Sequence, residues 1–291
     1  MEKIKIMASD GLALSGLYAK CDNPKALVQI MHGMAEHKER YEKLIEILNK
    51  EGYAVLITDM RGHGESVNDE YSLGHCGNKE LLVEDQMALT KFLKKEYPEK
   101  PLYIFAHSMG TLTCREYLKT HDDEVIKVIL SGTVCYKPGC GLGVSLAKRR
   151  AKKNPKGYSK LLFAMSNNFS TKADFSWLST NKENVKNYEA DPLCGFMFTN
   201  LSNHTLFSLT HDLHDYKSYK ANNKDLKILS ISGELDRTTG GKKGLKDVLK
   251  TLNKVGYNNV TIKEYPNMKH EILMENNNEE VFNDIVKFFG E

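Results

Sequence analysis

Short apolar runs alternate with helical patterns along most of this chain, and no other property of the sequence restricts its architecture as strongly. The candidate strands are the runs at 26–31, 53–58, 102–106, 125–130, 226–232 and 260–265. The helical patterns are those at 41–50, 79–96, 111–120, 244–255 and 279–289. Strands that alternate with helices build a parallel sheet through right-handed crossovers. We therefore predict an α/β fold with a mostly parallel central sheet and helices on both faces.

Two stretches depart from this alternation. Near the amino terminus, apolar residues in period two flank Asp10-Gly11, which predicts an antiparallel hairpin at a sheet edge. Residues 134–223 show no clear strand pattern, and a loop of that length inside one domain is typically a small subdomain. We predict a core of residues 1–133 and 224–291, with a helical cap at 134–223 inserted after the sixth strand.

Composition excludes several kinds of partner. The formal net charge of +3 is small for 291 residues, which argues against nucleic acid. The six cysteines include no Cys-x-x-Cys pair, so we expect neither a zinc cage nor a dense disulfide framework, and a cytoplasmic, reducing location is the simplest. The first residues lack the apolar stretch of a secretory signal, and no window is long and apolar enough to span a membrane. A lipid substrate would thus involve at most peripheral membrane contact. The oligomeric state stays open.

The strongest local pattern is Ala106-His107-Ser108-Met109-Gly110, which lies between a candidate strand and a candidate helix. A serine on a sharp strand-to-helix turn needs small residues two positions to either side, as here. Such a turn exposes the serine oxygen and directs the first amide of the helix, that of Met109, toward a developing oxyanion. The alternative is a surface serine in a glycine-containing loop.

A serine nucleophile needs a base, and the base needs an acid that orients it. Asp236 follows one late candidate strand and His270 follows the next, so both lie where α/β sheets form their ligand crevice. The order serine, acid, histidine is typical of one hydrolase fold. Asp236 could instead cap the following helix, with Glu234 as the other candidate acid, and His270 could be a solvated loop residue.

A second amide for an oxyanion hole is expected from the loop after an early strand. Met31-His32-Gly33-Met34 ends the run at 26–31. Gly33 allows the backbone to bend, so that the amide of Met34 can face Ser108.

Five segments together resemble a known family. They are His32-Gly33-Met34-Ala35-Glu36-His37 with Arg40-Tyr41, then Asp59-Met60-Arg61-Gly62-His63-Gly64-Glu65-Ser66, the Ser108 turn, Ser232-Gly233-Glu234-Leu235-Asp236, and Met268-Lys269-His270-Glu271. As an ordered set they are similar to the α/β-hydrolase superfamily, in particular to monoacylglycerol lipases and lysophospholipase-like serine hydrolases with a serine aminopeptidase S33-type domain.

The resemblance implies an α/β-hydrolase fold and a role for eight residues. Ser108, Asp236 and His270 would form the catalytic triad. Met34 and Met109 would donate the oxyanion-hole amides. Glu36, Arg40 and His107 would contact the polar alcohol part of a substrate. The chain has alanine at positions 35 and 106, where the family usually has glycine. The segment Arg61-Gly62-His63-Gly64 is interpreted as a packed turn and not as a reacting group.

These residues predict a serine esterase that acts on monoacylglycerol, lysophospholipid or similar short-to-medium acyl esters, and that requires no metal or organic cofactor. An aminopeptidase or a thioesterase is the alternative on the same scaffold, because a fold and a triad do not fix the leaving group. A noncatalytic ligand-binding protein that keeps the fold is the alternative of another class.

Two features of the predicted cap have two interpretations each. The basic run at 148–156 suits either a solvated helix face, which we favour, or contact with an anionic lipid surface. The apolar residues of the cap could wall an acyl tunnel or form the cap's own core; they are Leu161, Phe163, Phe196, Met197 and Phe198.

Overall fold

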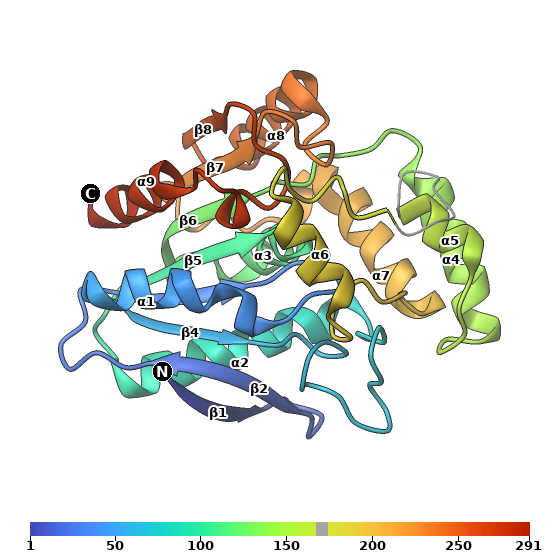
Figure 1. Cartoon of the computed structure of the whole chain (residues 1–291), viewed down its shortest axis with the longest axis horizontal. Coiled ribbons are helices and arrows are strands. Elements are labelled where there is room, and N and C mark those ends of the chain that lie inside the picture. Colours follow the sequence, from blue (N-terminus) through green and yellow to red (C-terminus); the bar gives the residue numbers. More distant parts are fainter. Residues whose placement is uncertain (167–173) are drawn as a thin grey trace.

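A computed structural model describes residues 1–166 and 174–291. Within them, eight strands form one sheet in the order β1-β2-β4-β3-β5-β6-β7-β8 (Figure 1). The strands are β1 Glu2–Met7, β2 Ala13–Ala19, β3 Leu27–Met31, β4 Ala54–Thr58, β5 Leu102–His107, β6 Val125–Ser131, β7 Lys227–Gly233 and β8 Asn259–Tyr265. The pairs β1-β2 and β2-β4 are antiparallel and the others are parallel. The predicted edge hairpin and mostly parallel sheet are thus confirmed.

Helices cover both faces of this sheet, as predicted. One face packs against α1 Glu42–Lys50 and α9 Glu279–Gly290, and the other against α2 Lys79–Glu96, α3 Met109–His121 and α8 Gly241–Val255. Successive strand residues point to opposite faces, so Leu27 joins one apolar core and Val28 the other. Strands buried on both sides need continuous apolar runs, which explains the pattern in the sequence.

Polar contacts fix the segment that the sequence analysis interprets as a packed turn. Arg61 is fully buried and donates to both carboxylate oxygens of Asp85, at 2.6 and 2.7 Å, and to Asp10 at 2.9 Å. His63 packs edge-on against the rings of Phe196 and Phe198, and burial lowers the pKa of its imidazole to about 3. The segment therefore packs, in agreement with that interpretation.

Between β6 and β7, the described residues form helices at the carboxyl ends of the strands (Figure 1). They are α4 Cys140–Lys153, α5 Lys160–Ser166, α6 Lys182–Ala190 and α7 Asn200–His211. Hydrogen bonds join this region to the core, since the Tyr188 hydroxyl and the Gly195 amide both donate to the carbonyl of Ala35, at 2.7 and 2.9 Å. This is the stretch for which we predict the cap.

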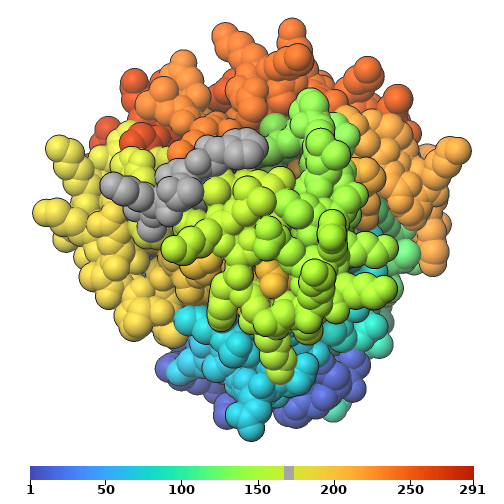
Figure 2. Space-filling model, turned by 90° about the vertical axis from the view of Figure 1, so that its right-hand side faces the viewer, coloured from blue at the N-terminus to red at the C-terminus, as the bar shows by residue number. Residues whose placement is uncertain are grey.

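The basic run lies on the surface of that region. Lys148, Arg149, Lys152 and Lys153 are exposed on or at the end of α4, which crosses the face seen in Figure 2. Exposed cations are compatible with a solvated helix face and also with contact to an anionic lipid surface. None of the helices in 1–166 and 174–291 is long and apolar enough to cross a membrane.

Candidate active site

Ser108 occupies a strained turn between β5 and α3. Its backbone has φ +51° and ψ −118°, a region that costs a non-glycine residue about 1–3 kcal/mol and that occurs mostly at functional sites. Gly110 makes the turn possible, because a Cβ there would lie 2.2 Å from the carbonyl oxygen of Met31. The fully buried Ala106 pairs with Met31 in the sheet, so its methyl group fits where the family usually has glycine.

The side chains of Ser108, His270 and Asp236 form one hydrogen-bonded row. His270 Nε2 lies 2.7 Å from Ser108 Oγ, and His270 Nδ1 lies 2.8 Å from Asp236 Oδ2. The acid and the histidine lie on the loops after β7 and β8, at the carboxyl end of the sheet. The structure therefore brings together the three residues that the order in the sequence singles out.

The two candidate acids, Asp236 and Glu234, differ in their hydrogen bonds and in their exposure. Asp236 Oδ1 accepts hydrogen bonds from the amide and the hydroxyl of Thr238, both at 2.8 Å, so Asp236 also organises the turn before α8. Glu234 is exposed and accepts a long contact, 3.4 Å, from the amide of Asn267. Only Asp236 of the two acids contacts His270.

Charge within the row sets the proton positions. Burial lowers the pKa of His270, but the charge and hydrogen bond of Asp236 outweigh the effect of burial. The pKa of His270 is therefore above its ordinary value. Burial raises the pKa of Asp236, and the charge and hydrogen bond of His270 outweigh it, so the pKa is lowered. An ionised Asp236 favours the tautomer that carries its proton on Nδ1, which leaves Nε2 free to accept the proton of Ser108.

The loop after β3 lies directly against Ser108. A Cβ on Gly33 would stand 2.5 Å from Glu36 Oε1 and 3.1 Å from the Cβ of Ser108, so the close approach favours glycine. Ala35 has φ +55°, in the left-handed region that glycine favours, so this loop keeps that conformation with alanine. The amide of Met109 is the first of α3 and has no carbonyl partner within the helix. Met34 and Met109 both border the cavity at Ser108.

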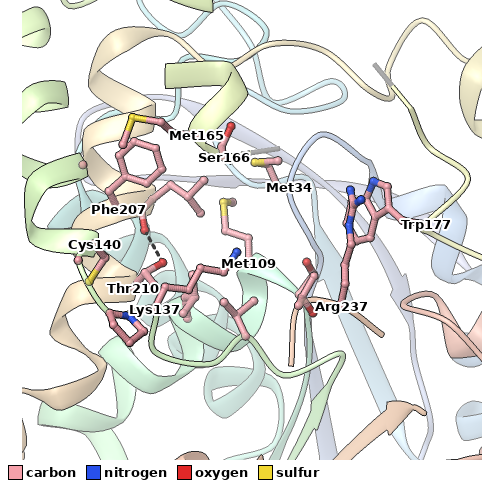
Figure 3. A pocket seen from close by; sticks show the side chains of 18 residues that line it. Met34, Met109, Lys137, Cys140, Met165, Ser166, Trp177, Phe207, Thr210 and Arg237 are labelled. Carbon is pink, nitrogen blue, oxygen red and sulfur yellow. Dashed lines mark hydrogen bonds between the residues drawn. The ribbon is translucent and has the colours of Figure 1, made fainter. Parts of the chain in front are cut away.

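That cavity is mainly apolar and measures about 300 Å³. In Figure 3, Phe207 lies on the left, Trp177 and Arg237 lie on the right, and Met34 and Met109 lie between them. Its apolar lining includes Met34, Met109, Leu112, Met165, Leu206 and Phe207. The space suits a hydrocarbon chain that ends at Ser108.

A second cavity, of about 60 Å³, touches Ser108 and His270, and its mainly apolar lining includes ionisable side chains. Glu36, His107 and Glu271 border it. Burial, with the nearby charge of His270, lowers the pKa of His107 to about 4, so its ring is neutral near pH 7. Phe163 and Phe196 of the predicted apolar set also border it.

Arg40 lies behind that second cavity. It donates to Glu36 at 2.8 Å and to both oxygens of Glu271 at 2.6 and 2.8 Å, and it borders a space of about 10 Å³. Burial raises the pKa of Glu36, but the positive charge of Arg40 outweighs the effect of burial and lowers this pKa to about 2. Of the three predicted head-group residues, Glu36 and His107 reach the cavity next to Ser108, and Arg40 holds Glu36.

Sequence reasoning missed two residues of the site. Trp177 borders both cavities, and its ring centroid lies 4.9 Å from that of His270. Glu271 belongs to a matching segment but received no role. Trp177 is the chain's one tryptophan, which is the signal that could have drawn attention to it.

Comparison with known proteins identifies the family. The sequence profile of the serine aminopeptidase S33 family matches residues 22–277. The chain belongs to the serine aminopeptidase S33 family. This S33 protein is 30% identical over 193 residues to monoglyceride lipase of Rattus norvegicus, a match that covers 65% of the chain and 59% of that relative. It is 25% identical over 272 residues to monoacylglycerol lipase of Mycolicibacterium smegmatis, covering 91% of the chain and 88% of the relative. The chain thus spans less than two thirds of the rat protein.

Solved structures agree with the fold of the S33 protein. A carboxyl esterase from Bacillus coagulans, crystallised with glycerol, superposes with a TM-score of 0.87 at 23% identity, over 99% of this chain and 97% of that one. The monoacylglycerol lipase of Paleococcus ferrophilus gives a TM-score of 0.76 at 26% identity, over 94% and 97%. The predicted α/β-hydrolase fold and the resemblance to monoacylglycerol lipases are confirmed.

Proposed function

We propose that this protein is a serine carboxylic-ester hydrolase in which Ser108 is the nucleophile, His270 the general base and Asp236 the orienting acid. The row of 2.7 and 2.8 Å contacts at the mouth of an apolar cavity is the observation that carries the proposal. The names of its relatives, lipases and esterases, support it.

The reaction has two stages. Ser108 Oγ attacks the acyl carbonyl while His270 Nε2 takes its proton, and the amides of Met34 and Met109 donate hydrogen bonds to the oxyanion. His270 then returns the proton to the departing alcohol, which leaves an acyl group on Ser108. Water, deprotonated by His270, releases the acid and restores the serine.

The side chains that border the two cavities favour an ester with an acyl chain on one side and a hydroxylated alcohol on the other. The apolar cavity would take the acyl chain, and the cavity bordered by Glu36 and His107 would take the hydroxylated alcohol. Monoacylglycerols and lysophospholipids have this character, and they are the substrate class that we propose.

Residues 134–223 would act as the cap that selects the acyl chain, because Met165, Leu206 and Phe207 of this stretch border the apolar cavity. We also propose a reducing, cytosolic location, since all six cysteines are free thiols.

The S33 family description favours one alternative, an aminopeptidase, for which an acidic cavity could hold a substrate amine. Arg40 engages both carboxylates there, which weakens this alternative.

The test compares turnover of monoacylglycerols of graded chain length, a lysophospholipid, acyl thioesters and proline amides. The proposal predicts the highest kcat/KM for an acyl ester and labelling of Ser108 by a fluorophosphonate. Preference for a proline amide would support the aminopeptidase instead, and an unlabelled Ser108 without turnover would support a noncatalytic protein.

A further inference from the structure

Three metal-ligating side chains of different chemistry meet outside the Ser108–His270–Asp236 row. They are His37, on the loop after β3, and Asp191 and Cys194, on the segment after α6. One ligand atom from each lies within 4.8 Å of the other two, and the described part of the chain holds no second group of this kind. The ester hydrolysis proposed above uses none of them.

The surroundings of His37 point to a cation. Its Nδ1 lies 2.7 Å from a carboxylate oxygen of Glu39, and its Nε2 lies 2.9 Å from one of Asp191. A neutral imidazole has one N–H and donates to only one of them, so its other nitrogen then faces an acceptor with a lone pair. Either a second proton or a metal ion on Nε2 satisfies this arrangement.

Glu39 lies where a metal-bound histidine usually has a carboxylate partner, next to the ring nitrogen that does not bind the metal. Ligating histidines commonly donate their second N–H to a carboxylate, which fixes the ring and raises its basicity. Here Glu39 would accept a hydrogen bond from Nδ1–H and leave Nε2 directed toward Asp191.

We propose that His37 Nε2, the Asp191 carboxylate and the Cys194 thiolate bind one Zn²⁺, with Glu39 as the positioning residue. Nitrogen, oxygen and sulfur are the donors that zinc prefers, and bond lengths of about 2.0–2.3 Å place tetrahedral ligands roughly 3.3–3.7 Å apart. Separations of up to 4.8 Å need shifts of about an ångström to reach that geometry. Binding releases the thiol proton to solvent.

Solvent access is compatible with such a site, whereas burial raises the pKa of the Cys194 thiol to about 12, so the metal ion has to displace a firmly held proton. His37 and Cys194 are buried, while the side chain of Asp191 is 32% exposed and opens the site to solvent and to a water as fourth ligand. The charge of nearby Arg40 is balanced by its two carboxylate partners, Glu36 and Glu271.

A metal ion here would join two segments that border the second cavity, the one lined by Glu36 and His107. His37 follows Glu36 in the chain, and Cys194 precedes Gly195 and Phe196; these neighbours border that cavity. The ion would therefore join the loop after β3 to the segment after α6. Its role would be structural, and it would not take part in the hydrolysis.

The experiment titrates ZnCl2 into the full-length protein after EDTA treatment and dialysis, by calorimetry. Cys140→Ser is the matched control, because Cys140 is a partly exposed thiol on α4. We expect one Zn²⁺ per chain in the wild type and in Cys140→Ser. Glu39→Gln should weaken binding roughly 10–100-fold, and Cys194→Ser or Asp191→Asn should weaken it more.

CoCl2 gives a second readout, since a cobalt–thiolate bond produces a charge-transfer absorption band. The wild type and Cys140→Ser should show this band and Cys194→Ser should lack it. The thermal transition of each variant without metal checks that it folds. Equal Zn²⁺ affinity of the wild type and a folded Cys194→Ser would exclude Cys194 as a ligand and overturn the proposal. The absence of saturable binding to the wild type would overturn it as well.

Discussion

Glu271 accepts two hydrogen bonds from Arg40, at 2.6 and 2.8 Å, in the chain position next to His270. Arg40 lies 231 residues earlier in the sequence. The amide of Glu271 also donates to the carbonyl of Leu178, and Asn184 donates to its carboxylate. The loop that carries His270 is thus fastened both to the loop after β3 and to the segment between β6 and β7.

Removing the cation of this network should destabilise the fold. Arg40→Met leaves the carboxylates of Glu36 and Glu271 buried without their cation, and breaking a buried ion pair in this way costs about 3–5 kcal/mol. Lys91→Met, at an exposed position of α2, is the control and should change the free energy of unfolding by less than about 0.5 kcal/mol. Urea unfolding measures both. Equal urea midpoints for Arg40→Met and Lys91→Met would show that the network adds nothing to stability.

Ser108→Ala should reduce kcat for a p-nitrophenyl ester by at least about 10⁴-fold, because the acyl-enzyme can no longer form. The helical circular dichroism should stay unchanged. Ser145→Ala, at an exposed position of α4, should retain wild-type turnover. Residual activity of Ser108→Ala near the wild-type level would exclude Ser108 as the nucleophile.

The pH profile should report His270. The base must be neutral to accept a proton, and its pKa lies above the ordinary value of about 6.5, so kcat/KM should fall as the pH drops through that higher value. Asp236→Asn removes the charge that raises this pKa, which should move the acid limb to lower pH and reduce kcat roughly 10⁴-fold. Glu234→Gln should change neither quantity. An unmoved acid limb in Asp236→Asn would contradict the assignment of His270 and Asp236.

The apolar cavity should set acyl length. Leu206→Trp adds bulk to its lining, so activity should shift toward shorter acyl chains, measured as kcat/KM across p-nitrophenyl esters. Leu142→Trp, 78% exposed on α4, should keep the wild-type profile. The same profile for both variants would mean that the acyl chain lies elsewhere.

The fold was accessible from the sequence because strands buried on both faces must be apolar throughout. The run at 226–232 became β7 and the pattern at 79–96 became α2, while α3 begins two residues earlier than predicted, at Met109. Helix ends depend on local capping that apolar periodicity does not record.

Part of the site could be predicted for a similar reason. Ser108, Asp236 and His270 each follow a strand of one parallel sheet, so their chain order implies a common edge. The partnership of Arg40 with Glu271 could not be predicted, because it depends on side-chain packing between distant loops. The cluster of His37 with Asp191, 154 residues apart, was missed for the same reason: spacing rules find only ligands that are close in sequence.

The strain at Ala35 gives a further prediction. Ala35→Gly should stabilise the protein by up to about 1 kcal/mol, because glycine adopts positive φ without the penalty of a Cβ. Ala88→Gly, inside α2, should destabilise it by about 1 kcal/mol. Chemical denaturation of the two variants gives the comparison. Destabilisation by Ala35→Gly would indicate that the methyl group contributes packing that exceeds the strain.

His270 follows Ser108 by 162 residues and is supplied by the loop after the last strand of the sheet. During synthesis, the serine therefore leaves the ribosome long before its imidazole exists. A chain that ends early, or one from which a protease removes the final loop and helix, keeps the alcohol group without the base that we propose for it. Such fragments would be incapable of hydrolysis by the proposed route, so activity at Ser108 would require synthesis to proceed past the loop after β8.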